Sequence, residues 1–240
     1  MQLEFLVGVF EFVLLIFSLS FHECAHAWMA SRLGDQTARM QGRVTLNPMY
    51  HVDPIGTLIF PAIAIFGPLI GFGMFGGLLI GWAKPTPVIT RNFRKIVRDD
   101  NLTTLAGPCS NALIVLAAFV VLTVVSLAAP GGHEMVLSTF FEGTLNMDAP
   151  SGVQALQGLV LIAILAIEVN LSLFVFNLLP IPPLDGSRIV RNMLPYNAVV
   201  QYDKITGWVS YLLLIFLGRY IMGLFLTPLH ALVGFGLSLV

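Results

Sequence analysis

Residues 5–33, FLVGVFEFVLLIFSLSFHECAHAWMASRL, are apolar enough to cross a bilayer and carry the motif HECAH at residues 22–26. A helix of this length, at about 1.5 Å per residue, spans the hydrocarbon core and protrudes from it. His22 and His26 share one face of such a helix, about 5–6 Å apart, which is close enough to hold one zinc ion. Glu23 beside them is suited to accept a proton from water. Ionisable groups at membrane depth are costly, so they indicate a functional site.

The composition is that of a membrane protein. The chain has 240 residues, of which 57% are hydrophobic and 10% are charged, and its mean hydropathy is +0.87. Soluble domains carry about 25% charged residues. The net charge of −1 gives no basis for nucleic-acid binding. We therefore predict an all-α polytopic membrane protein that forms one membrane-embedded domain over residues 1–240.

The remaining apolar segments predict further spans. Residues 103–129 and 153–178 are continuous apolar runs, and residues 205–226 form another that is interrupted by Arg219. Residues 227–240 are apolar but too short for a separate span, so we expect one or two C-terminal membrane segments beyond the first three spans. Within the polar stretch after the first span, residues 42–46 weakly resemble a short β-strand.

The distribution of basic residues sets the topology. Lys and Arg concentrate in three loops, at 32–43, 84–98 and 188–204, whereas the loop at 130–152 contains acidic residues and neither Lys nor Arg. The positive-inside rule places the basic loops in the cytoplasm. Residues 55–82 are apolar but rich in Gly and Pro, and cytoplasmic loops flank them on both sides. We therefore predict that they form a re-entrant hairpin rather than a full span.

A catalytic zinc ion needs a third protein ligand in addition to the two histidines. The candidates are His51, Asp53, Glu168 and Asp185. Topology favours Asp185. With a re-entrant 55–82, the next two spans return the chain to the cytoplasmic side near the depth of the histidines. If 55–82 crossed the bilayer, Asp185 would lie on the opposite side and could not reach the zinc ion.

Two motifs link the chain to a known family: HECAH at 22–26 and NLLPIPPLDG at 177–186. Further matching segments follow in the same order along the chain: NPMYHVDPIG at 47–56, GWAKPTPV at 81–88 and AGPCSN at 106–111. On these residues the chain resembles the site-2 protease family of intramembrane zinc metalloproteases, peptidase family M50, in a compact form without an inserted PDZ or an appended CBS domain. The matching segments lie between residues 22 and 186, a range that covers about two-thirds of the chain.

The resemblance implies a three-helix catalytic core, here 5–33, 103–129 and 153–178. It implies one zinc ion per chain, held by His22, His26 and Asp185, with Glu23 as the general base toward the attacking water. Asn111 and Asn177 match polar family positions that support the active site or the substrate backbone. His51 either supports the active site as well or staples its own loop by hydrogen bonds.

The function implied is intramembrane proteolysis. The substrate would be a membrane-anchored protein cut in or near its transmembrane segment, and the enzyme would be a multi-pass protein of the cell membrane with its active site in the cytoplasmic half of the bilayer. Three alternatives remain: a relative that binds membrane segments without cutting them, a metal or ion transporter, and another class of membrane metalloprotease with Glu168 as the third ligand. A transporter usually shows repeated halves, and the sequence shows no internal repeat.

Overall fold

The computed structural model describes residues 2–71, 81–146, 148–205 and 208–240, and in these ranges it contains helices and no strand. The predicted strand at 42–46 is therefore wrong, because these residues form turns and bends. The N–H of Arg43 donates to the carbonyl of Ala38 at 2.9 Å, which turns the chain back toward the preceding helix. An isolated extended stretch gains no ladder of hydrogen bonds without a neighbouring strand.

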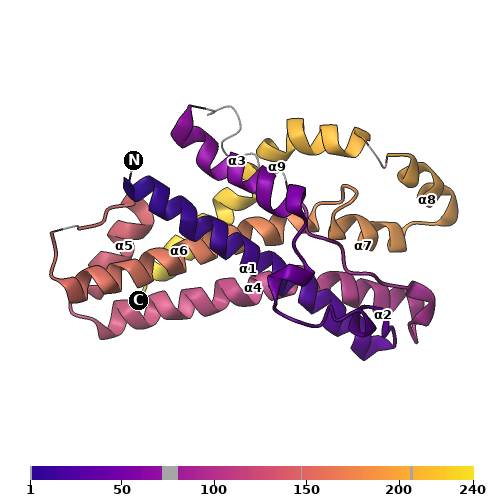
Figure 1. Cartoon of the computed structure of the whole chain (residues 1–240), viewed down its shortest axis with the longest axis horizontal. Coiled ribbons are helices and arrows are strands. Elements are labelled where there is room, and N and C mark those ends of the chain that lie inside the picture. Colours follow the sequence, from indigo (N-terminus) through magenta and orange to yellow (C-terminus); the bar gives the residue numbers. More distant parts are fainter. Residues whose placement is uncertain (1, 72–80, 147, 206–207) are drawn as a thin grey trace.

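Four long helices dominate the fold: α1 (Gln2–Leu33), α4 (Ile96–Ala128), α6 (Ser151–Leu178) and α9 (Trp208–Ser238). Each contains a stretch long and apolar enough to cross a membrane. The helical architecture and these four candidate spans agree with the predicted polytopic membrane protein. Figure 1 shows α1, α4 and α6 running alongside one another, and all three pairs of these helices are in contact.

Shorter elements connect the long helices. They are α2 (Thr37–Met40), η1 (Pro48–Tyr50), η2 (Pro54–Ile59), α3 (Phe60–Phe66), η3 (Gly67–Ile70), η5 (Thr90–Asn92), α5 (Gly132–Glu142), α7 (Asp185–Met193), α8 (Tyr196–Tyr202) and η6 (Asp203–Ile205).

Several boundaries differ from the sequence prediction. Helix α4 begins at Ile96, ahead of the predicted residue 103, so part of the basic loop is helical. Helix α9 continues past the predicted end at 226 to Ser238, and Pro228 lies inside it. The acidic loop at 130–152 contains α5, which begins and ends beside glycines in the left-handed conformation, Gly131 at φ 69° and Gly143 at φ 65°.

The apolar core lies away from the HECAH motif. Its largest cluster joins α4, α5, α6 and α9 through Leu122, Val136, Ile167 and Leu237, all of which are fully buried. A smaller cluster joins α1 to α6 through Leu15, Val169 and Leu173. Polar side chains take over between the same helices nearer the cytoplasmic ends predicted from the sequence. The bundle therefore holds a polar layer beside an apolar one.

The segment 55–82 begins and ends at one place. The N–H of Trp82 donates to the carbonyl of Gly56 at 3.1 Å, and the hydroxyl of Thr57 donates to the carbonyl of Trp82 at 2.8 Å. Between these contacts the chain forms η2, α3 and η3, and residues 72–80 lie outside the described residues. The closeness of the two ends suits a hairpin, whereas its re-entry into a bilayer stays a prediction.

Candidate metal centre

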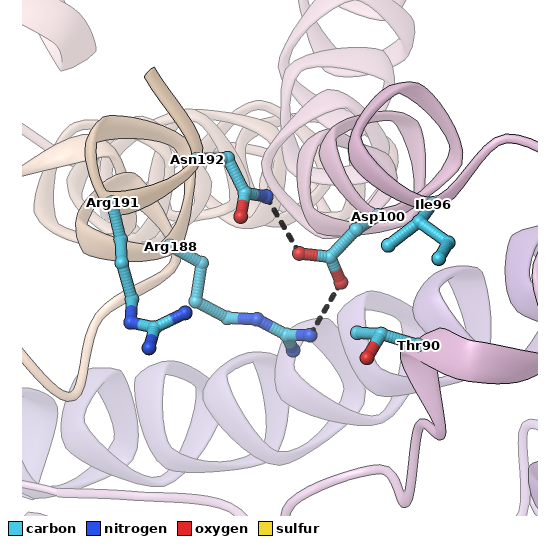
Figure 2. A pocket seen from close by; sticks show the side chains of 6 residues that line it. All are labelled: Thr90, Ile96, Asp100, Arg188, Arg191 and Asn192. Atoms are coloured by element: carbon cyan, nitrogen blue, oxygen red, sulfur yellow. Dashed lines mark hydrogen bonds and ion pairs between the residues drawn. The ribbon is translucent and has the colours of Figure 1, made fainter. Parts of the chain in front are cut away.

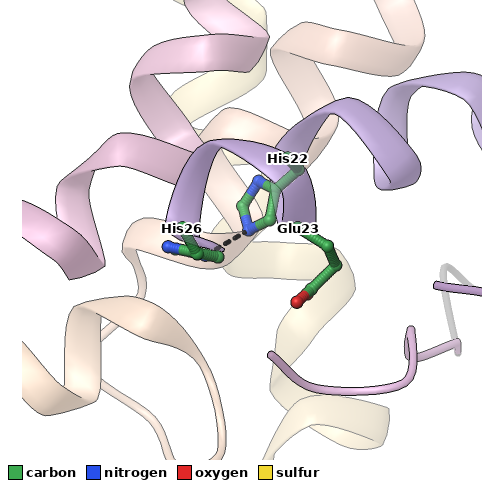
Figure 3. A group of neighbouring side chains, drawn as sticks. All are labelled: His22, Glu23 and His26. Carbon is green, nitrogen blue, oxygen red and sulfur yellow. Dashed lines mark hydrogen bonds between the residues drawn. The ribbon is translucent and has the colours of Figure 1, made fainter. Parts of the chain in front are cut away.

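Three side chains from two helices bring acceptor atoms together. The Nε2 atoms of His22 and His26, one turn apart on α1, lie 3.0 Å from each other. Asp185, the first residue of α7, places Oδ2 at 3.1 Å from Nε2 of His22 and 3.3 Å from Nε2 of His26. Figure 3 shows the two imidazole rings and the Glu23 side chain projecting from α1 into the same space. Both histidines are buried.

The other ring nitrogen of each histidine is held by α4. Nδ1 of His26 lies 2.8 Å from the carbonyl oxygen of Thr103, which can only accept a hydrogen bond. Nδ1 of His26 therefore carries a proton, and in the neutral ring Nε2 presents a lone pair. Nδ1 of His22 lies 2.6 Å from Oδ1 of Asn111.

A buried amide chain fixes the orientation of Asn111. Nδ2 of Asn170 on α6 lies 2.9 Å from the carbonyl of Ala166, so it must donate there, and it also donates to Oγ of Ser18 at 2.9 Å. Oδ1 of Asn170 is then left to accept from Nδ2 of Asn111 at 2.9 Å. Oδ1 of Asn111 consequently faces His22 as an acceptor, so His22 carries its proton on Nδ1 as well.

The result is three acceptors that face one another. Two Nε2 lone pairs and a carboxylate oxygen at 3.0–3.3 Å repel unless they share a cation. A single proton bridges only one pair of these acceptor atoms at a time, whereas a metal ion can be bound by all three. With Zn–N and Zn–O bonds of about 2.0–2.1 Å, two ligands of a tetrahedral zinc ion lie about 3.3 Å apart. The donor set and its spacing therefore fit zinc.

Gly107 on α4 lies directly beside the ring nitrogens of the two histidines. A Cβ atom built on Gly107 would lie 2.4 Å from Nε2 of His26 and 2.5 Å from Nε2 of His22, closer than real Cβ contacts allow. The backbone of α4 thus approaches the acceptor atoms directly, and any larger residue would occupy the space between them.

Glu23 is held by a different part of the chain. Its Oε2 accepts from the backbone N–H of Thr86 at 2.9 Å and from the Thr86 hydroxyl at 2.7 Å. Thr86 lies in the segment after residue 81, which has no helical structure up to η5. One carboxylate oxygen of Glu23 and one ring nitrogen of each histidine all lie within 4.8 Å of one another. The carboxylate therefore borders the metal centre.

Comparison with known proteins agrees with this geometry. Residues 10–217 match the family described as Peptidase family M50. The chain belongs to peptidase family M50. Over 221 residues it is 37% identical to "Putative zinc metalloprotease YwhC" of Bacillus subtilis (strain 168), which covers 92% of this chain and 82% of the relative. Over 182 residues it is 30% identical to "Putative zinc metalloprotease Rip2" of Mycolicibacterium smegmatis, which covers 75% of this chain.

The chain spans 56% of the length of this Rip2 protein. No solved structure matches the chain. Membership of the M50 family, the names of the relatives and the four apolar helices together support a multi-pass membrane protease of the site-2 type.

The other residues predicted for the site of this M50 protein lie in different surroundings. Nδ2 of Asn177 donates to the carbonyl of Leu173 on its own helix at 2.9 Å, whereas Asn111 contacts His22. His51 is buried, and its Nε2 donates to the carbonyl of Thr45 at 2.8 Å, as the loop-staple alternative requires. The two amides therefore differ: only Asn111 is joined to a histidine by a hydrogen bond in the described part of the chain.

Asp53 and Glu168, the other two carboxylates among the four candidates for the third ligand, have partners elsewhere. Oδ1 of Asp53 accepts from the N–H groups of Ile55 and Gly56 at the start of η2. Glu168 on α6 lies 3.6 Å from Nε2 of His230 on α9, and both side chains are partly exposed. Asp185 is the one of the four candidates whose carboxylate lies against both histidines in the residues described.

Sequence reasoning missed Thr86, Thr103, Asn170 and Gly107. Asn170 had a usable signal, because an amide at membrane depth must find a hydrogen-bond partner. Thr103 acts through its backbone carbonyl, which no residue type reveals. Gly107 and Thr86 lie inside the matched segments 106–111 and 81–88, but their roles depend on distances that a sequence does not contain.

Proposed function

We propose that this chain is an intramembrane zinc metalloprotease that hydrolyses peptide bonds in or near the transmembrane segments of membrane-anchored proteins. The observation that carries the proposal is the convergence of His22, His26 and Asp185 at 3.0–3.3 Å with the Glu23 carboxylate beside them. Two nitrogens, one carboxylate oxygen and a neighbouring base make up the ligand set of a catalytic zinc site with an open position.

His22, His26 and Asp185 hold one zinc ion per chain in this proposal. When bound, zinc polarises a carbonyl oxygen and lowers the pKa of water toward about 7. Asn111 and the Thr103 carbonyl keep both histidines protonated on Nδ1, so that both Nε2 lone pairs face the metal.

Glu23 is the general base. Its carboxylate accepts a proton from the attacking water and passes it to the leaving amine. Thr86 donates two hydrogen bonds to Oε2, which fixes the rotamer of the carboxylate and directs the proton transfer to Oε1. Glu23 is close enough to the ring nitrogens to act through a single intervening water.

The substrate segment must be extended at the site, because a helix shields its carbonyls within its own hydrogen bonds. We place the enzyme in the cell membrane with the metal centre in the cytoplasmic half of the bilayer, in one membrane-embedded domain. The distribution of Lys and Arg between the loops supports this orientation. The re-entrant hairpin at 55–82 belongs to the same proposal.

The test combines zinc analysis with cleavage of a panel of membrane-anchored reporters. Glu23→Gln should retain one zinc per chain and lose cleavage, because glutamine keeps the side-chain shape but not the basic carboxylate. Glu168→Gln is the matched control, and it should leave both zinc and cleavage unchanged. It also tests the rival in which Glu168 is a ligand.

Each rival has its own outcome. Cleavage by Glu23→Gln would reject the base assignment. A wild-type chain that binds zinc but cuts none of the reporters would favour an inactive relative, and zinc flux across liposomes that persists in Glu23→Gln would favour a transporter.

A further inference from the structure

Helix α7 delivers the third ligand from a position outside the three-helix bundle. Asp185 is its first residue and follows an irregular, proline-rich connection from the end of α6. The start of the helix packs very closely on that end: a Cβ on Gly186 would lie 2.1 Å from the carbonyl oxygen of Leu178. This contact places the start of α7 but leaves the direction of the helix to be fixed elsewhere.

A second attachment lies further along α7. Asp185, Arg188 and Asn192 follow one another at spacings of three and four residues, so they share one helix face. Nη2 of Arg188 donates to Oδ1 of Asp100 at 2.7 Å, and Nδ2 of Asn192 donates to Oδ2 of Asp100 at 2.7 Å. Figure 2 shows both side chains reaching from α7 to this single carboxylate on α4.

The Asp100 side chain is buried in the protein interior. It is 7% exposed, whereas that of Arg188 is 40% exposed. A buried carboxylate must be paired, and hydrogen bonds between ionised groups are among the strongest in proteins. Both oxygens of Asp100 are used by α7, so the carboxylate fixes the direction of that helix as well as its distance from α4.

The same stretch of α4 also orients the histidines. Thr103, whose carbonyl holds His26, lies three residues after Asp100, and Asn111, which holds His22, lies further along the same helix. All three ligands of the proposed zinc site therefore take their positions from α4. Two of them do so directly, and Asp185 does so through Asp100.

We propose that Asp100 is a positioning residue of the metal centre, which sets Oδ2 of Asp185 against the two Nε2 atoms by clamping Arg188 and Asn192. The inference rests on the proposed zinc site. It assigns no contact with substrate or metal to Asp100. Loss of the clamp lets α7 pivot about Gly186 and weakens metal binding through Asp185 alone.

The test measures zinc affinity of the full-length purified protein by competition with a chelator. Asp100→Asn and Arg188→Gln should each weaken zinc binding by about tenfold, the lower end of the range for partners that orient metal ligands. Arg191→Gln is the matched control. It removes an arginine from the same helix that lines the same pocket, but this arginine donates its hydrogen bonds to Asp203 and not to Asp100. Because the ion pair with Asp203 is half exposed, zinc affinity should stay within about twofold.

A second background separates positioning from general destabilisation. In Asp185→Ala protein, which binds zinc through the two histidines only, Asp100→Asn should weaken zinc binding no further. An equal loss in both backgrounds, or no loss in the wild-type background, would overturn the inference. Failure of the wild-type protein to bind zinc would instead overturn the proposed function.

Hydrogen exchange of the metal-free protein gives an independent reading. Asp100→Asn should speed exchange of the α7 amides, residues 185–193, at least threefold, whereas Arg191→Gln should not. Unchanged exchange of α7 in Asp100→Asn would contradict the clamp even where the Asp185→Ala background binds zinc too weakly to measure.

Discussion

The proposed metal ligands His22 and His26 (the metal side) and the proposed base Glu23 (the base side) are held by different kinds of structure. His26 is oriented by a buried hydrogen bond to the Thr103 carbonyl on α4. His22 is oriented by a buried hydrogen bond to Asn111 on α4, which in turn is held by Asn170 on α6. Glu23, one residue from His22, is held instead by Thr86 in an irregular segment. Neighbouring residues on one helix thus depend on different parts of the fold.

The segment that holds Glu23 is itself attached to loops. The N–H of Lys84 donates to the carbonyl of His51, and the N–H of Ile89 donates to Oδ2 of Asp35 at 2.6 Å. Asp35 is fully buried, and its other oxygen accepts from Thr37 and from Asn92. The positions of the two histidines are therefore fixed by packed helices, whereas the position of the Glu23 carboxylate can change when the loops move.

The largest effect should come from filling the space between the histidines. Gly107→Ala places a Cβ against the Nε2 atoms of His22 and His26, the proposed zinc ligands, so zinc affinity should fall by more than about a hundredfold and cleavage should be lost. Gly158→Ala on α6 is the control, because nothing lies within 4 Å of its added Cβ. Zinc analysis of both variants checks this, and full zinc occupancy in Gly107→Ala would contradict the geometry.

A smaller effect on the metal side is expected from Asn111→Leu. This change leaves Nδ1–H of His22 buried without its acceptor, and zinc affinity should fall about 10- to 100-fold. Asn177→Leu removes an amide that bonds only within its own helix turn among the described contacts, so it should leave zinc affinity unchanged. Equal losses in the two variants, measured by chelator competition, would remove the special role of Asn111.

The base side should respond in rate and not in metal content. Thr86→Val removes the hydroxyl bond to Glu23, so kcat should fall about tenfold while KM and zinc affinity stay the same. Thr86→Ser retains the hydroxyl and should restore most of the rate. A loss of zinc in Thr86→Val would show that the two sides are not separate.

The smallest effect on the site is expected at Asp35, which supports the base side from a distance. Burial alone would raise the pKa of Asp35, but hydrogen bonds from Thr37, Asn92 and the backbone N–H of Ile89 outweigh it and lower the pKa. Its stabilising contribution is therefore complete above the unfolded-state pKa of about 3.9 and is lost as the pH falls through the lower folded-state pKa.

Asp35→Asn should consequently destabilise the loop at neutral pH by about 1–3 kcal/mol, and the difference from wild type should shrink below about pH 4. Hydrogen exchange of the amides at 37–57 as a function of pH measures this. A difference that grows on acidification would have the wrong sign for a carboxylate with a lowered pKa.

The sequence contained the parts of the fold that follow from hydropathy and spacing. The HECAH spacing predicts a shared helix face. The long apolar runs predict both ends of α1 and α6 and the end of α4 to within a few residues, whereas α4 begins earlier than predicted, at Ile96. Asp185 could be selected as the third ligand only by deriving the topology from the distribution of charged residues. Its position against both histidines depends on α7, which no pattern around residues 177–186 specifies.

The sequence did not predict the features that depend on contacts with residues far away along the chain. Residues 42–46 have strand-like residues but no neighbouring strand, and α9 continues through Pro228 because the helix packs on α5 and α6. Thr86 acts through its contact with Glu23, which lies 63 positions away in the sequence. Asp100 acts through its contact with Arg188, which lies 88 positions away. Such pairings follow from packing and not from local preference.

X-ray absorption at the zinc edge of the purified wild-type protein identifies the atoms that bind the metal. We expect two imidazole nitrogens and oxygen ligands at about 2.0–2.1 Å, with one imidazole lost in His26→Ala. A sulfur ligand at about 2.3 Å, which would bring in Cys24 or Cys109, or a spectrum unchanged by His26→Ala, would contradict this expectation.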